Sequence, residues 1–224
     1  MTDDTLLDAI EIETGDTPTA SLIVLHGLGA DGSDFVPVCE ALELDDLGPL
    51  RFVLPHAPVR PVTINGGYRM RAWFDILGTP IDRREDEAGL RESVVAVEAL
   101  IRRERARGVA AERIVLMGFS QGCAMTLLSG LRHAERLAGL AGLSGYLPLA
   151  AATAAERHPA NAATPVFLAH GRDDDIVPLA RAAAARDALV ALGQPVEWHE
   201  YAMPHSVCAE EVADLNRWLR RVLA

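Results

Sequence analysis

The chain of 224 residues contains no lysine, because all 21 of its basic residues are arginine. It therefore has no side-chain amine for a Schiff base or a lysine nucleophile. It has only three cysteines, Cys39, Cys123 and Cys208, which are too few for a disulfide framework and lack the CxxC spacing of a zinc site. We therefore expect a protein of a reducing compartment that uses no metal and no other cofactor.

The sequence also lacks segments for export or membrane crossing. Residues 1–16 are acidic, without the basic and apolar regions of a secretory signal, and no apolar run approaches the length of a bilayer span. The formal net charge of −11 argues against a nucleic-acid partner and against steady attachment to anionic lipid. We expect a cytoplasmic protein with no stable membrane insertion. A homodimer is compatible with the sequence, which does not fix the oligomeric state.

Half of the residues are hydrophobic and a quarter are charged, which is typical of a globular protein. The length predicts a single domain over residues 1–224. Short apolar runs, predicted to be strands, alternate with longer helical patterns. The strands are expected at 21–26, 51–55, 113–117, 137–144, 165–170 and 195–201, and the helices at about 34–44, 84–107, 121–136, 179–192 and 206–223. This alternation predicts an α/β fold with a doubly wound, mostly parallel sheet and helices on both faces.

One long segment, residues 55–86, breaks this alternation. It contains several prolines and glycines and shows no convincing period. A loop of this length in a compact domain is usually functional or disordered. Its aromatic and apolar residues argue against disorder, so we expect a folded cover near the functional site.

The stretch MGFSQGCA, residues 117–124, contains the pattern GxSxG between a predicted strand and a predicted helix. This is the sequence context of a nucleophile elbow, in which a serine sits at the tip of a sharp turn. Glycine is expected at Gly118 and Gly122 because larger side chains there would collide. The pattern alone also arises by chance, but the flanking strand and helix favour Ser120 as a nucleophile.

A serine hydroxyl needs a base to accept its proton and an acid to orient that base. His205 lies in a loop between the last strand and the last helix, where a serine hydrolase of this fold presents its base. The run HGRDDDIVP supplies three adjacent candidates for the acid, Asp173, Asp174 and Asp175. Solvation, turn formation and helix capping are equally good roles for an aspartate here, so spacing alone does not choose among them.

The glycine-rich turn after the first central strand has two possible uses. His26 at its start resembles a rival base, and the turn resembles a phosphate cradle, although it has neither GxGxxG nor GxxxxGK. A better use is an oxyanion hole, in which the backbone amide of Leu28 acts beside that of Gln121, the residue after the serine. We expect the other histidines to be surface, turn or core residues, and Cys123 to be a helix-packing residue.

Several blocks together resemble the carboxylesterase and acyl-protein thioesterase family of serine α/β hydrolases, also called the phospholipase/carboxylesterase family. The blocks LHGLGADGSDF, LPHAPVRPVTINGGYRMRAWFDI, MGFSQGCAM, LSGYLP, HGRDDDIVP and YAMPHSVC follow the family's order from about residue 21 to the C-terminus. The resemblance implies an α/β-hydrolase fold, the catalytic triad Ser120, Asp174 and His205, and oxyanion donors at Leu28 and Gln121. It also implies that Trp73 lines the acyl groove.

What the resemblance implies for activity is a serine carboxylesterase that hydrolyses short to medium acyl esters through an acyl-enzyme, with thioesters or lysophospholipids as further substrates. The alternatives are an acyltransferase or peptidase on the same fold, or a non-catalytic binding protein.

Among the polar residues of the cover, Asp75 is expected to brace its loop. Arg69 and Arg71 add positive charge to the cover, and either favour an acidic ester or are merely solvated. The sequence leaves the physiological substrate and the acyl length open.

Overall fold

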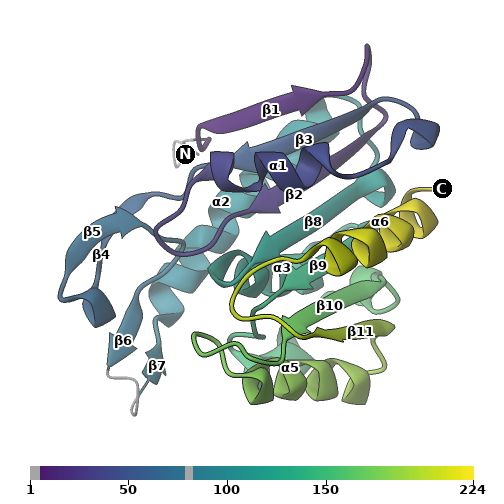
Figure 1. The fold of residues 1–224 in the computed structure, drawn as a ribbon. Helices are drawn as coiled ribbons and strands as arrows, with labels where there is room; N and C mark the ends of the chain where they lie inside the picture. Colours follow the sequence, from purple (N-terminus) through teal and green to yellow (C-terminus); the bar gives the residue numbers. More distant parts are fainter. Residues whose placement is uncertain (1–5, 79–82) are drawn as a thin grey trace.

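The computed structural model describes residues 6–78 and 83–224, and its centre is a seven-stranded sheet (Figure 1). The strand order is β1-β3-β2-β8-β9-β10-β11, and every neighbouring pair is parallel except β1 with β3. The strands are β1 Ala9–Glu13, β2 Ala20–Leu25, β3 Leu50–Pro55, β8 Ile114–Phe119, β9 Gly139–Leu143, β10 Val166–Gly171 and β11 Val196–Tyr201. The six predicted strands are all present, and the predicted mostly parallel α/β fold is confirmed.

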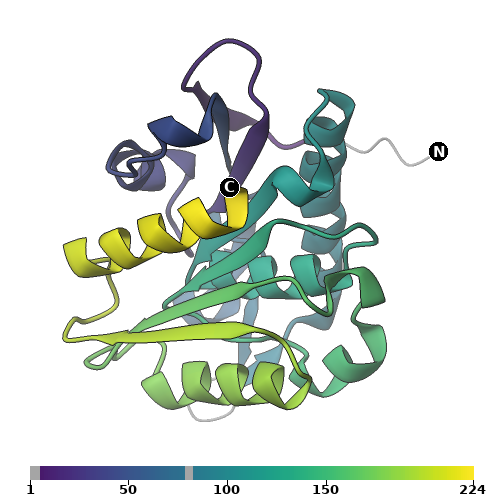
Figure 2. The same ribbon diagram turned by 90° about the vertical axis from the view of Figure 1, so that its right-hand side faces the viewer.

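Helices cover both faces of this sheet (Figure 2). They are α1 Val36–Glu40, α2 Glu87–Ala106, α3 Gln121–Arg132, α4 Ala150–Glu156, α5 Leu179–Ala191 and α6 Ala209–Leu223. Buried residues of α2, α3 and α5 form one apolar cluster against the sheet, and those of α1 and α6 belong to a second cluster on the other face. None of the helices in the described ranges combines the length and apolar character needed to cross a bilayer.

The central strands are continuous apolar runs because both of their faces are buried. In β2, Leu22 and Val24 pack into the cluster with α1 and α6, whereas Ile23 and Leu25 pack into the cluster with α2 and α3. Side chains of a strand alternate between its faces, so a strand covered on both sides carries apolar residues along most of its length.

The sequence prediction missed β1, an antiparallel strand at the edge of the sheet. Its sequence, AIEIE, alternates, with Ile10 and Ile12 packed against an apolar cluster.

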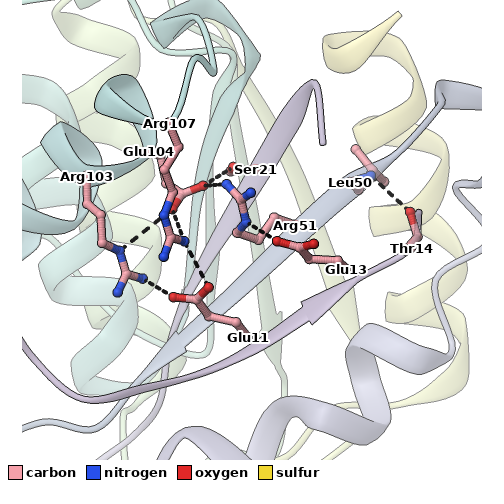
Figure 3. Close-up of polar contacts among 9 residues, drawn as sticks. All are labelled: Glu11, Glu13, Thr14, Ser21, Leu50, Arg51, Arg103, Glu104 and Arg107. Atoms are coloured by element: carbon pink, nitrogen blue, oxygen red, sulfur yellow. Dashed lines mark hydrogen bonds and ion pairs between the residues drawn. The ribbon is translucent and has the colours of Figure 1, made fainter. Parts of the chain in front are cut away.

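Glu11 and Glu13 belong to a group of ion pairs that joins β1 to β3 and to the end of α2 (Figure 3). At the centre of this group Glu104, fully buried, accepts hydrogen bonds from Ser21, Arg51 and Arg107. These contacts lie near the amino ends of β2 and β3, away from the loops that carry the site.

The five predicted helices are all present but shorter than expected, and α1 and α3 end four residues early. In place of a helix over residues 34–44, a 3-10 turn at Gly32–Phe35 leads into α1, which ends at Glu40. The helix predicted over residues 121–136 ends at Arg132, because His133 adopts an extended backbone conformation.

The described residues of the segment 55–86, which the sequence predicted to be an irregular cover, contain regular structure. Its strands are β4 Val59–Val62, β5 Tyr68–Arg71, β6 Ile76–Gly78 and β7 Arg83–Glu85, which pair as two antiparallel hairpins. Figure 1 shows these hairpins beyond the carboxyl ends of the parallel strands. Residues 79–82 of the expected cover lie outside the described residues.

Candidate active site

Four loops at the carboxyl ends of parallel strands carry the candidate residues. Leu28 follows β2, Ser120 follows β8, Asp174 follows β10 and His205 follows β11. This is the edge where ligands bind in sheets of this type.

Ser120 occupies a strained turn between β8 and α3. Its backbone φ of 57° and ψ of −114° lie in a region that residues other than glycine rarely adopt. A Cβ added to Gly118 would lie 2.2 Å from the Gly122 carbonyl oxygen, and one added to Gly122 would lie 1.9 Å from that of Leu25. The turn therefore requires glycine at both positions, as the sequence pattern predicted, and it presents a partly exposed serine.

His205 and Asp174 form a hydrogen bond of 2.7 Å between Nδ1 and Oδ2. The other carboxylate oxygen of Asp174 accepts from the backbone amides of Ile176 and Val177, at 2.9 and 2.8 Å. Asp174 is buried, whereas Asp173 and Asp175 are exposed. Of the three candidates in the sequence, the aspartate that meets His205 is therefore Asp174.

The His205 ring also packs against Phe119, the residue before Ser120, with 4.7 Å between ring centroids. Among the hydrogen bonds between described residues, none joins Ser120 Oγ to His205. Hydrogen bonds of this kind are often long without substrate and tighten in the complex. The structure thus brings the imidazole to the serine turn and orients it from behind with a carboxylate.

A second buried histidine supports Asp174. His170 Nε2 lies 2.7 Å from the Val177 carbonyl oxygen and 3.2 Å from Asp174 Oδ2. Since a carbonyl only accepts, Nε2 carries the proton, and Nδ1 has no hydrogen-bond partner among the described residues. Burial lowers the pKa of His170 and favours the neutral ring. The sequence prediction treated His170 only as a surface, turn or core residue, since its contact with Asp174 depends on how residues 171–177 fold back.

The loop of Leu28 is fixed by backbone contacts to the cover. Gly29, with a φ of 79°, donates its amide to the Arg71 carbonyl at 2.9 Å. Leu28, Ser120 and Gln121 line the same cavity. Gln121 begins α3, so its backbone amide is one of the helix N–H groups without a partner inside the helix. The arrangement can place two amides near an oxygen of a bound carbonyl.

His26 is a structural residue of this loop. Its Nδ1 lies 2.7 Å from the Gly27 carbonyl oxygen, and its Nε2 accepts the Ala57 amide at 3.0 Å. Both ring nitrogens are occupied, and burial of the side chain lowers the pKa of His26. These contacts argue against His26 as a rival base.

The burial of Trp73 contradicts the expectation that it lines the acyl groove. Its side chain is fully buried, with Nε1 donating to the His26 carbonyl, and it is absent from the residues that line the cavity. Phe74 lines the cavity instead. The side chain of Gln121 holds both residues, because it accepts the Trp73 amide and donates to the Phe74 carbonyl, each at 3.0 Å. Trp73 therefore anchors the cover.

The polar residues of the cover mostly brace it. Asp75 accepts the backbone amide and the hydroxyl of Thr63, at 2.7 and 2.5 Å, which is the bracing expected of it. Arg69 donates to the Val59 carbonyl, and Arg71 donates to the Ala57 carbonyl. Neither arginine is among the residues that line the cavity.

Cys123 is fully buried within α3, and burial raises the pKa of its thiol to about 12. A thiol that stays protonated and inaccessible is a poor nucleophile. Cys123 is therefore the helix-packing residue that the sequence predicted.

The chain is similar to known proteins over almost its whole length. A family model described as phospholipase/carboxylesterase matches residues 7–223. The chain is 38% identical over 216 residues to acyl-protein thioesterase 1 of Yarrowia lipolytica, covering 94% of this chain and 95% of that one. It is 41% identical over 229 residues to acyl-protein thioesterase 1 of Mycosarcoma maydis, covering 96% and 95%. The crystal structure of Zea mays acyl-protein thioesterase 2 superposes with a TM-score of 0.86 at 30% identity, covering 97% of this chain and 99% of that one.

Proposed function

The chain belongs to the phospholipase/carboxylesterase family, and on this premise we propose that it is a serine hydrolase of carboxylic esters and thioesters. In this proposal Ser120 is the nucleophile, His205 the base, and Asp174 the acid that orients the base. The observation that carries the proposal is the 2.7 Å bond from His205 to buried Asp174, formed beside the strained turn of Ser120.

Each of these residues has one task in the proposed reaction. Ser120 Oγ attacks the carbonyl carbon while His205 Nε2 takes the hydroxyl proton, and Asp174 holds Nδ1–H and stabilises the imidazolium. The oxyanion of the tetrahedral intermediate accepts hydrogen bonds from the Leu28 and Gln121 amides, at the positive end of α3. His205 returns its proton to the leaving alcohol or thiol, which leaves Ser120 acylated.

The second half of the reaction releases the acid. Water loses a proton to His205 and attacks the acyl-enzyme carbonyl, and a second oxyanion forms at the same two amides. When this intermediate collapses, Ser120 Oγ departs with the proton held by His205.

For the substrate, we propose acyl esters and thioesters whose acyl chain lies in the cavity beside Ser120. Six apolar residues line this cavity, which suits a hydrocarbon chain; they are Leu28, Phe74, Ile76, Leu90, Ile176 and Val177. The curated relatives are named acyl-protein thioesterases, which supports thioesters as well as esters. We propose that the protein acts in the cytoplasm without a nucleic-acid partner, consistent with its net charge of −11.

Hydrolysis of a p-nitrophenyl acyl ester tests the proposal. Ser120→Ala removes the nucleophile, and we expect kcat/KM to fall by about 10⁴-fold or more. Ser33→Ala changes an exposed serine in the 3-10 turn Gly32–Phe35 and is expected to keep the activity of the unmodified chain. Circular dichroism confirms that both variants are folded. Full retention of hydrolysis by folded Ser120→Ala would reject the assignment.

A further inference from the structure

The candidate cavity contains a positive charge that the proposed reaction does not use. Arg181 lies in the first turn of α5, and its guanidinium carbon is 3.7 Å from the centroid of the Tyr146 ring. Arg181 and Tyr146 line the same cavity as Ser120. A guanidinium stacked on a ring is held in position while the N–H groups at its edge remain available to another partner.

No acceptor within the described part of the chain uses those N–H groups. The Arg181 guanidinium has five N–H donors, but it forms no hydrogen bond or ion pair with another described residue. Arg186, on the same helix, differs because its guanidinium has an ion-pair partner. It pairs with Asp187 at 2.8 Å, lies over Trp198, and is not part of the cavity lining.

The two acidic residues of the cavity have other partners. Both carboxylate oxygens of Asp75 accept hydrogen bonds from Thr63. Glu85 accepts the Leu149 amide at 3.0 Å. Neither acid forms an ion pair with Arg181, so no carboxylate among the described residues of the cavity occupies its guanidinium.

We propose that the preferred substrates carry a carboxylate at the far end of the acyl chain, as monoesters or monothioesters of dicarboxylic acids do. This inference rests on the proposed function, because the ester carbonyl is placed at Ser120. The methylenes of such a chain lie along the apolar wall, and the terminal carboxylate accepts parallel N–H bonds from Arg181.

Arg84 also lines the cavity, beside the acids Asp75 and Glu85. A single carboxylate that meets Arg181 is repelled less by these two acids than a doubly charged group would be. The net charge of −11 repels any anionic ester at long range, so Arg181 acts in the bound complex rather than by attracting the substrate from solution.

The test compares two p-nitrophenyl esters of equal chain length on the purified full chain. One acyl chain ends in a methyl group and the other in a carboxylate, and the chain is too long for the carboxylate to attack its own ester. The measured quantity is the ratio of kcat/KM for the carboxylate ester to that for the methyl ester. Because the ratio is taken within each variant, any loss of folded protein cancels.

We expect this ratio to fall by about ten-fold or more in Arg181→Ala, as for the loss of a charge-assisted hydrogen bond. Arg181→Lys, which keeps the charge but loses the planar fork, should give an intermediate ratio. Arg186→Ala is the matched control on the same helix and should keep the ratio of the unmodified chain. An unchanged ratio in Arg181→Ala, with both esters hydrolysed, would overturn this inference alone. Failure of the unmodified chain to hydrolyse either ester would overturn the proposed function as well.

Discussion

Asp174 is held by more contacts than orienting His205 alone would require. Two backbone amides bind one of its oxygens, while His205 and His170 approach the other, at 2.7 and 3.2 Å. His170 also donates to the Val177 carbonyl and so closes the turn that carries Asp174. A carboxylate fixed in this way keeps the imidazole in one orientation, which general-base catalysis needs. We therefore regard His170 as a positioning residue.

Replacing His170 tests this role at the scale of one residue. His170→Leu leaves the Val177 carbonyl unpaired in a buried turn, so we expect the free energy of unfolding to fall by about 1–3 kcal/mol. Displacement of Asp174 should also lower kcat/KM by roughly 10- to 100-fold. His170→Gln, which keeps an N–H donor, should retain more of both quantities. Urea unfolding and ester hydrolysis measure them, and no change in either for His170→Leu would contradict the role.

At the scale of elements, the central strands were predictable because burial on both faces leaves a continuous apolar run. The edge strand β1 was not, since its sequence AIEIE reads as part of an acidic N-terminal stretch. Glu11 pairs with Arg103 of α2 and with Arg107 at the end of that helix, which lie far away in the sequence. The two hairpins of the cover were also missed, because their strands show no convincing period in the sequence. Contacts with Gln121 and Thr63 hold Phe74 and Asp75, which connect the two hairpins.

Some residues of the candidate site were likewise predictable from the sequence, and others were not. Ser120 and His205 follow strands in recognisable motifs, so their location was predictable. The choice of Asp174 among three adjacent aspartates came from the family resemblance and not from its spacing. Phe74 was missed because neighbouring aromatic residues in an irregular segment do not reveal which one faces the cavity. Arg181 was missed because an arginine in a helical pattern is usually solvated, and only the structure shows it stacked on Tyr146.

The group of ion pairs between β1, β3 and the end of α2 depends on Glu104, which is fully buried (Figure 3). Glu104→Ala removes the acceptor of Ser21 and Arg51, and we expect it to lower the free energy of unfolding by about 3–5 kcal/mol. Glu112→Ala changes an exposed glutamate and should alter it by less than about 0.5 kcal/mol. Chemical unfolding measures both variants. Equal stability of the two would show that the buried ion pairs do not hold these elements together.

At the scale of the whole molecule, stability should depend on pH through one buried carboxyl group. Burial raises the pKa of Glu211 in α6 from 4.5 to about 8. Between these values the folded chain holds a proton that the unfolded chain has lost, so raising the pH favours unfolding. The contribution of Glu211 to the free energy of unfolding is fully present below pH 4.5 and is lost as the pH rises through about 8.

Glu211→Gln keeps the shape of the side chain but cannot ionise. We expect the unmodified chain to lose stability relative to this variant as the pH rises between 4.5 and about 8, by up to about 1.4 kcal/mol per pH unit. The free energy of unfolding, measured by urea titration at several pH values, provides the difference. Parallel curves for the two proteins would contradict a protonated Glu211 in the folded state.

The measurement that tests the central claim most directly is the location of a fluorophosphonate adduct on the full chain. Trypsin cuts this lysine-free protein only after arginine, so Ser120 and Ser129 fall in one peptide, residues 114–132, and fragmentation distinguishes them. We predict an adduct on Ser120 that disappears in His205→Ala, since the serine then has no base. An adduct on another serine, or unchanged labelling of Ser120 in His205→Ala, would contradict the account.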